Sequence, residues 1–284
     1  MKKILVTGAN GFIGSALVRA LWKEYDVYGL GRYKSETVSI IWDFFHELPE
    51  RKLPSNIDVI IHAGGIVGMN NKYSEDDYNQ VNVQSCKALA DYGAKIHVSQ
   101  LIYLSTGGLY EMGTFLHKET DPILSNNKYL TSKAKSEEKL QKFNDLMNVM
   151  IIRLFFPYGP GQSGRLIPKL VENISNDLPI QLNDLKGRPR IAPIYISDVI
   201  FVIDNFIRMK YSGIINLSGP NIVSIRELAE NIGDLLNKIV LYEILGISSR
   251  DLLGDNTCLF SLLPDFRLTN IREGLSKTFL MKSN

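Results

Sequence analysis

Short apolar runs alternate with longer amphipathic segments along the first half of the chain. Residues 12–24 place Ile13, Leu17 and Leu21 on one face, at the 3.6-residue period of a helix. Nearly continuous apolar strands separated by helices are typical of a parallel sheet that is buried on both faces. The pattern therefore predicts an α/β fold, with strands expected at 4–6, 26–30, 38–42, 58–62, 101–105 and 149–153.

Two helix starts carry the spacing of a capping box, in which a serine is followed three residues later by an acid. Ser74 begins one such helix, expected to end near Tyr92, and Ser224 begins another, expected to end near Leu236. After Phe155 the alternation gives way to prolines, glycines and shorter elements. We therefore expect a large sheet domain followed by a smaller mixed region.

Composition narrows the classes of protein that the chain can belong to. The 284 residues are 45% hydrophobic, enough for a sizeable core. The net charge of +2 is nearly balanced, so it does not indicate electrostatic attraction to nucleic acid or an anionic membrane. No apolar run reaches the roughly 18 residues of a membrane span, and the N-terminus opens directly into a strand. Cys86 and Cys258 lie far apart, without metal-ligand spacing. We expect a soluble, cytoplasmic, metal-independent protein with no nucleic-acid or membrane partner, in which His62 is a buried imidazole.

A glycine-rich turn connects the first predicted strand to the first predicted helix. Gly8, Gly11 and Gly14 fall in this turn, where a Cβ would obstruct both the backbone conformation and the close approach of a pyrophosphate. The helix N-terminus then offers free N–H groups to that anion. The turn predicts dinucleotide binding by Gly8, Asn10, Gly11, Phe12, Ile13 and Gly14.

Tyr129 and Lys133 lie four residues apart in a predicted helix, so both side chains project from the same helix face. A tyrosine is a poor acid or base near neutrality, because its unperturbed pKa is about 10. A neighbouring ammonium favours the phenolate and brings the phenol into a useful range. The pair predicts proton transfer beside a bound dinucleotide, with a third group expected at the end of the fifth strand.

Together these features resemble the extended short-chain dehydrogenase/reductase family, in its branch of nucleotide-sugar epimerases, dehydratases and reductases. The turn resembles the family's Gly-x-x-Gly-x-x-Gly pattern, and residues 153–161 and 195–199 resemble later family segments. The resemblance covers essentially the whole chain. It implies a Rossmann-type doubly wound parallel sheet with a smaller, mixed α/β C-terminal substrate region. Residues 1–155 would form the dinucleotide-binding domain, and 156–284 mainly the substrate-binding region, with some segments returning to the first domain.

The end of the second strand distinguishes the two nicotinamide cofactors. An acid there binds the ribose 2′-hydroxyl of NAD, whereas an arginine accommodates the 2′-phosphate of NADP. Here Gly31 takes the place of the acid and Arg32 follows it, which favours NADP, with NAD as the alternative. The resemblance adds further cofactor contacts at Asp43, Phe44, Ala63, Gly64, Gly65, Ser105, Tyr129, Lys133 and Phe155.

The resemblance also completes the predicted proton relay. The Thr106 hydroxyl would hold the substrate oxygen next to Tyr129, and Ser105 is the near alternative. Asn82 would support the relay from the preceding long helix; the alternative is an amide that satisfies local backbone groups. The expected catalytic set is Asn82, Thr106, Tyr129 and Lys133.

The substrate side departs from the family pattern in two places. The acid pair that removes water in the family's 4,6-dehydratases is replaced by Gly107 and Gly108, so dehydration is not expected. Phe156 replaces an asparagine that commonly contacts the nucleotide-sugar, and Arg190 lies close to the arginine expected at a substrate phosphate. The expected substrate contacts are Thr106, Gly107, Gly108, Phe156 and Arg190.

The leading hypothesis is hydride transfer at C4 of a nucleotide-activated sugar, most simply reduction of a 4-keto sugar. The alternatives are a 4-epimerase that retains NAD and, more remotely, a non-catalytic dinucleotide-binding regulator. Such regulators typically lose the tyrosine or the lysine, and this chain keeps both. The resemblance implies a homodimer formed through the Asn82 and Tyr129 helices, and the charged run from Lys133 to Lys142 is expected to be a solvated helix face.

Overall fold

The computed structural model describes residues 1–280, and these form two compact units. The first unit contains Met1–Leu109, Ile123–Arg153 and Ile200–Ile215. The second contains Tyr110–Pro122, Leu154–Val199 and the chain from Asn216 onward. The chain therefore passes between the units several times.

A seven-stranded sheet, ordered β10-β7-β5-β4-β1-β2-β3, forms the centre of the first unit. Strand β1 pairs in parallel with β2 on one side and with β4 on the other, and β2–β3 and β4–β5 are also parallel. The predicted α/β fold with a Rossmann-type parallel sheet is confirmed. The strands are β1 Lys3–Thr7, β2 Asp26–Gly31, β3 Ile40–Ile41, β4 Val59–His62, β5 Gln100–Thr106, β7 Asn148–Leu154 and β10 Gly213–Leu217.

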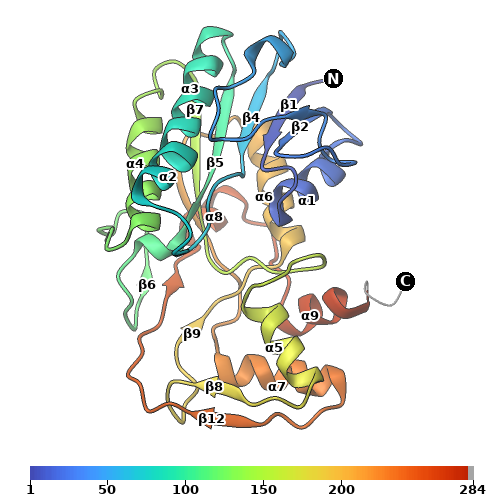
Figure 1. Cartoon of the computed structure of the whole chain (residues 1–284), viewed down its shortest axis with the longest axis vertical. Helices are drawn as coiled ribbons and strands as arrows, with labels where there is room; N and C mark the ends of the chain where they lie inside the picture. The colour runs from blue at the N-terminus through green and yellow to red at the C-terminus, as the bar shows by residue number, and fades with distance from the viewer. Residues whose placement is uncertain (281–284) are drawn as a thin grey trace. The chain divides into compact units, whose positions relative to one another are not determined.

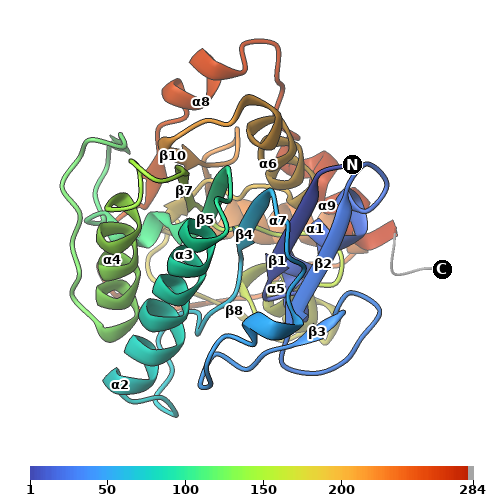
Figure 2. The ribbon, with the colours of Figure 1, turned by 90° about the horizontal axis from the view of Figure 1, so that it is seen from above.

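Helices cover both faces of this sheet. Helices α3 (Ser85–Lys95) and α4 (Lys128–Gln141) lie together on one side, while α1 (Phe12–Leu21) and α6 (Ile196–Met209) lie on the other (Figures 1 and 2). Because both faces are covered, most residues in the interiors of these strands are apolar. Leu5, Ile60 and Leu101, from three neighbouring strands, are completely buried in one core cluster.

Two predicted elements differ from their observed forms. The helix expected from Ser74 begins with the predicted capping box, closed by Asp77, but it is divided into α2 (Glu75–Tyr78), a π-helical segment η2 (Asn79–Gln84) and α3. The strand expected at 38–42 is reduced to β3. The residues just before β3 instead make side-chain hydrogen bonds: Ser39 Oγ accepts from Gly29 N at 3.1 Å, and Thr37 Oγ1 donates to Ala9 O at 2.7 Å.

The second unit is built from short strand pairs and helices. The predicted capping box at Ser224 is confirmed, with Glu227 closing it at the start of α7 (Ile225–Leu236). The strands pair as β11–β9, β12–β8 and β13–β6. The short strands are β6 Leu116–His117, β8 Ile180–Leu182, β9 Arg190–Ile191, β11 Val223–Ser224, β12 Tyr242–Ile244 and β13 Leu253–Gly254. The other helices are α5 Leu166–Ser175, α8 Thr257–Leu262 and α9 Ile271–Leu280. Two 3-10 turns, η1 Glu50–Lys52 and η3 Gly107–Leu109, belong to the first unit.

Candidate active site

The glycine turn packs its backbone too closely for side chains at two positions. Gly8 has φ +69°, and a Cβ there would lie 2.6 Å from the Cα of Gly64. A Cβ at Gly14 would collide with the carbonyl oxygen of Gly8, whereas at Gly11 the nearest atom would be that oxygen at 3.1 Å. Helix α1 starts after Gly11 without a side-chain cap and without an acid in its first turn. This close-packed backbone and uncapped helix N-terminus fit the pyrophosphate of a dinucleotide.

The loop after β4 lies directly against this turn. The ring of Phe44 occupies the space that a Cβ at Gly64 would need, and it packs edge-on to Trp42, with ring centroids 4.5 Å apart. Asp43 precedes this ring, and its carboxylate accepts from Phe45 N at 3.2 Å. The predicted cofactor residues after β3 and β4 are therefore neighbours of the glycine turn.

The end of β2 is organised by Asn10. Its side-chain oxygen accepts from Tyr33 N at 3.2 Å and occupies the space that a Cβ at Gly31 would fill, so an acid at that position would have to displace the Asn10 side chain. The Asn10 amide nitrogen donates to Tyr33 O at 3.0 Å. The exposed Arg32 follows on this fixed loop.

Lys133 is buried on the inner face of α4. Its Nζ donates to Leu104 O at 2.8 Å and lies 4.5 Å from the centroid of the Tyr103 ring. Burial lowers the pKa of Lys133 to about 8, while Cys86 and Glu137 act in the opposite direction. The side chain is therefore mostly an ammonium at neutral pH, held in surroundings that screen its charge poorly.

Tyr129 occupies the first turn of α4, which Asn127 caps by accepting from Leu130 N at 3.0 Å. The Tyr129 ring is half-buried and packs against Tyr78, with ring centroids 6.4 Å apart. The neighbouring Lys128 donates to Tyr73 O and lies 5.5 Å from the Tyr78 ring. The start of α4 is thus fastened to the segment that precedes α2.

Thr106 and Ser105 end β5 on opposite faces, because successive strand side chains alternate. The Ser105 hydroxyl donates to the buried carboxylate of Glu137. Thr106 is half-buried, and its Oγ1 accepts from Gly108 N at 3.1 Å. Ser105 therefore faces the interior under α4, and Thr106 is the hydroxyl that remains directed away from that interior.

Asn82 is buried in the π-helical segment with its amide fully engaged. The oxygen accepts from Ile66 N at 2.7 Å, and the nitrogen donates to Ile66 O at 3.0 Å and Ser132 Oγ at 2.8 Å. The amide also fills the space beside Gly65. Asn82 thus connects the loop after β4 to α4; its role in the relay stays a prediction.

The charged run from Lys133 to Lys142 is not a solvated face throughout, and that expectation was wrong. Lys133, Glu137 and Leu140 point inward, whereas Glu138 is exposed and pairs with Lys142 at 3.1 Å. Sequence reasoning missed Glu137 as a buried residue. Its position four residues after Lys133 and eight after Tyr129, on the same helix face, is the signal that could have found it.

Three of the predicted site residues, Phe155, Phe156 and Arg190, lie in the second unit. Phe155 is buried and stacks on Tyr110, with centroids 6.1 Å apart. Phe156 has φ +48°, an uncommon conformation for a bulky residue. Arg190 pairs with Asp251, Nε to Oδ2 at 2.8 Å, while 41% of the arginine side chain stays exposed. Their cofactor and substrate roles stay predictions.

His62 confirms the expected buried imidazole and gives a testable pH dependence. Its Nδ1 lies 2.6 Å from Thr7 Oγ1, and the ring stacks on Tyr103. Burial lowers its pKa from 6.5 to about 3, with the charge of Lys133 as the second cause. Since the unfolded chain binds the proton more readily, the stabilisation is present above pH 6.5 and is lost as pH falls toward 3. We expect a loss of up to about 1.4 kcal/mol per pH unit in this window.

Urea unfolding at a series of pH values measures this effect. The variant His62→Asn should show a shallower loss of unfolding free energy between pH 6.5 and 4 than the parent protein. The matched control is His46→Asn, since His46 is exposed. An unchanged slope in His62→Asn would contradict the assignment.

Within residues 1–280, no helix combines the length and apolar character that a membrane crossing requires. The same residues contain no cluster of three or more histidine, cysteine or acidic side chains that could hold a metal ion. The cytoplasmic location stays a prediction.

The sheet, its strand order and the glycine turn define a Rossmann-type protein. The chain belongs to the NAD dependent epimerase/dehydratase family, whose model matches residues 4–218. This confirms the family that the sequence motifs indicate.

Curated relatives include different members of that family. The chain is 30% identical over 202 residues to a UDP-glucose 4-epimerase of Neisseria meningitidis serogroup C, covering 63% of this chain and 59% of that protein. It is 27% identical over 246 residues to a UDP-2-acetamido-2,6-beta-L-arabino-hexul-4-ose reductase of Pseudomonas aeruginosa, covering 83% and 58%. The chain thus spans about three fifths of the length of these relatives.

Among solved structures, a UDP-glucuronic acid 4-epimerase from Bacillus cereus, crystallised as a Tyr-to-Phe mutant with NAD and a fluorinated sugar nucleotide, has the same fold. Its TM-score is 0.86 at 21% identity, covering 98% of both chains. At this identity the likeness shows the fold alone.

Proposed function

We propose that this chain is a nicotinamide-dependent oxidoreductase that reduces C4 of a nucleotide-activated 4-keto sugar. The observation that carries the proposal is the buried ammonium of Lys133 one turn from Tyr129 on α4, the helix that packs on β5 where Thr106 ends the strand. Residues 1–155 would be the dinucleotide-binding domain, and residues 156–284 mainly the substrate-binding region, with some segments returning to the first domain.

The bound nicotinamide would supply the hydride, and the chain would manage the proton. The Tyr129 hydroxyl donates its proton to the C4 oxygen as charge develops there, and the nearby Lys133 ammonium stabilises the phenolate that remains. The Thr106 hydroxyl donates a hydrogen bond to the same oxygen. Asn82 keeps the loop after β4 attached to α4 through Ile66 and Ser132.

The residues next to Thr106 argue against elimination of water. Gly107 and Gly108 form a 3-10 turn directly after β5 and carry no carboxylate. Elimination from a sugar needs an acid and a base placed beside the reacting carbons. Simple hydride transfer is the chemistry that these residues support.

The loop after β2 supports NADP as the cofactor. Asn10 Oδ1 lies where a Cβ at Gly31 would be, so Gly31 offers no carboxylate to a ribose hydroxyl, and the exposed Arg32 follows it directly. A guanidinium suits a 2′-phosphate. NAD is the alternative, because the solved structure named above contains NAD.

A 4-epimerase with retained NAD is the second candidate, favoured by the 30% identity to a UDP-glucose 4-epimerase. Both candidates use the same Tyr129, Lys133 and Thr106 chemistry. They differ in whether the cofactor leaves after each turnover.

An assay of cofactor retention and cofactor preference distinguishes the reductase from the epimerase. We expect the purified protein to lose its cofactor on dialysis, to bind NADPH more tightly than NADH, and to reduce a nucleotide-activated 4-keto-6-deoxyhexose. Arg32→Ala should remove the preference for NADPH, and Arg51→Ala, at another exposed arginine, should keep it. Retention of NAD through dialysis, with interconversion of UDP-glucose and UDP-galactose, would establish the epimerase instead.

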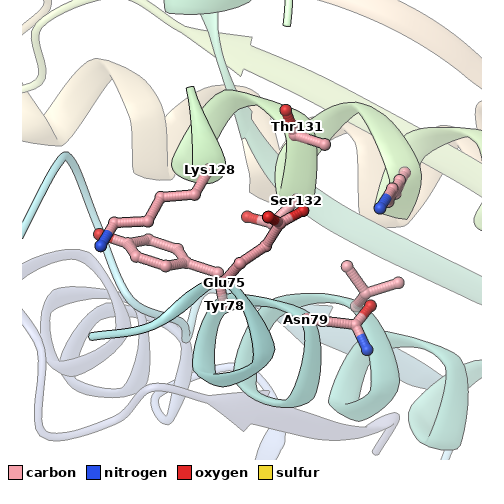
Figure 3. Close-up of a pocket in the computed structure, with 8 residues that line it drawn as sticks. Glu75, Tyr78, Asn79, Lys128, Thr131 and Ser132 are labelled. Atoms are coloured by element: carbon pink, nitrogen blue, oxygen red, sulfur yellow. The ribbon is translucent and has the colours of Figure 1, made fainter. Parts of the chain in front are cut away.

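We further propose a homodimer through the α2–η2–α3 stretch and α4. These segments run side by side, and a shallow depression between them is lined by Glu75, Tyr78, Asn79, Lys128, Thr131 and Ser132 among others (Figure 3). Their polar outer surface favours a salt-dependent association. Sedimentation at low and high salt would detect it.

A further inference from the structure

One buried carboxylate links three segments that surround the proposed proton relay. Glu137 on α4 is 2% exposed, and Arg153 near the end of β7 is 5% exposed. The Arg153 Nη2 donates to Glu137 Oε2 at 2.8 Å, and Nε lies 3.3 Å from both carboxylate oxygens. The Ser105 hydroxyl donates to Oε1. The carboxylate therefore makes hydrogen bonds to residues near the ends of two neighbouring strands, β5 and β7, at the same time.

The positions of these residues connect the network to the reacting groups. Ser105 immediately precedes Thr106, so a contact that fixes Ser105 also fixes the start of the following turn. Glu137 lies one helical turn after Lys133 and two after Tyr129, on the same face of α4. A single carboxylate thus sets the register between the helix that carries the phenol and the strand that carries the hydroxyl.

Glu137 also supplies the negative charge that faces Lys133 from its own helix. The other titratable groups packed around Lys133 are Cys86 of α3, Tyr103 of β5 and His62 of β4, and burial keeps each of them neutral near neutral pH. The Leu104 carbonyl contributes only a dipole. On the far side of the carboxylate, Arg153 balances its charge in part.

We propose that Glu137 is a positioning residue of the proton relay, which holds the end of β5 against α4 through Ser105 and Arg153 and keeps Lys133 in its ammonium form. The inference rests on the proposed function for the identity of the relay. It assigns to Glu137 no contact with substrate or cofactor.

The charge of Glu137 is tested by Glu137→Gln, which keeps the shape of the side chain. The titration of Lys133 is followed by NMR of protein labelled with ¹³C at the lysine Cε atoms, with Lys133→Met identifying its signal. The carboxylate favours the Lys133 ammonium, and its loss also leaves Arg153 as an unbalanced positive charge, so the Lys133 midpoint should fall by about one pH unit. Glu138→Gln is the matched control, because Glu138 is the adjacent, exposed acid of the same helix. Equal midpoints in the two variants would overturn the electrostatic role.

The geometry is tested by Glu137→Asp, which keeps the charge but shortens the side chain by one methylene. The Lys133 midpoint should stay near its parental value, while the maximal rate of sugar reduction falls at least about tenfold, because the shorter carboxylate cannot reach Ser105 and Arg153 together. A parental rate in this variant would overturn the positioning role. This variant keeps the test decisive if Glu137→Gln, which breaks a buried ion pair, fails to fold.

Failure of the inference is separable from failure of the proposed function. If the parent protein reduces no nucleotide-activated sugar and exchanges no hydride, the proposed function is wrong. If the parent protein is active and both Glu137 variants behave like Glu138→Gln, the inference alone is wrong.

Discussion

Tyr129→Phe is expected to lower the proposed rate of sugar reduction by about a thousandfold, while the protein folds and binds its cofactor as before. The phenylalanine ring can keep the packing against Tyr78, whose ring centroid lies 6.4 Å away, so the start of α4 is preserved. The variant would lose the proposed proton donor at the C4 oxygen, and positioned acid–base groups typically contribute between about a hundredfold and ten-thousandfold. The loss should appear in kcat, with little change in KM.

The rate is measured by the disappearance of NADPH absorbance, and the fold by thermal unfolding. Tyr73→Phe provides the matched control, because Tyr73 is another half-buried tyrosine that packs on Tyr78, with ring centroids 6.4 Å apart. Its turnover should stay within about twofold of the parent. Near-normal turnover in Tyr129→Phe would refute the role of this phenol.

Gly14→Ala is expected to abolish cofactor binding and to lower the free energy of unfolding by about 1–3 kcal/mol. The new Cβ would collide with the carbonyl oxygen of Gly8 and lie 2.6 Å from its carbon, and these are backbone atoms that cannot move independently. Opening the turn would displace the N–H groups at the start of α1 from the position where a pyrophosphate binds.

Gly93→Ala makes the same addition in a setting that can accommodate it. Its Cβ would meet the terminal carbons of Ile60 and Met147 at 3.3 Å, which are flexible side-chain ends, and alanine is the better helix former. NADPH fluorescence titration and urea unfolding compare the two variants. Equal affinity for NADPH in Gly14→Ala and Gly93→Ala would mean that the turn does not hold the cofactor.

Many of the helices and strands were predictable because their signals are local. Apolar strands, helical periodicity and two capping boxes depend on neighbouring residues, and the observed Ser74 and Ser224 caps follow directly from sequence. The interruption of the long helix by η2 does not follow from the sequence in this way. The π-helical segment accompanies the hydrogen bonds of Asn82 to Ile66 and Ser132, partners that only the folded chain brings together.

The same distinction applies to the site. The order of the glycine turn, Thr106 and the Tyr129–Lys133 pair is readable along the chain, since each motif has a fixed spacing. The helix face of Glu137 is readable too, but its two partners are not, because they come from strands β5 and β7. A charged run on a helix is usually solvated, and here a tertiary ion pair reverses that expectation for one of its faces.

Transfer of isotope to the substrate tests the central claim most directly. The protein is incubated with a nucleotide-activated 4-keto-6-deoxyhexose and NADPH that carries deuterium at the transferred position, and the product is analysed by NMR. We expect deuterium bonded to C4 with the parent protein, and essentially none over the same interval with Tyr129→Phe. A reduced product without deuterium at C4, or full labelling by the phenylalanine variant, would contradict the account.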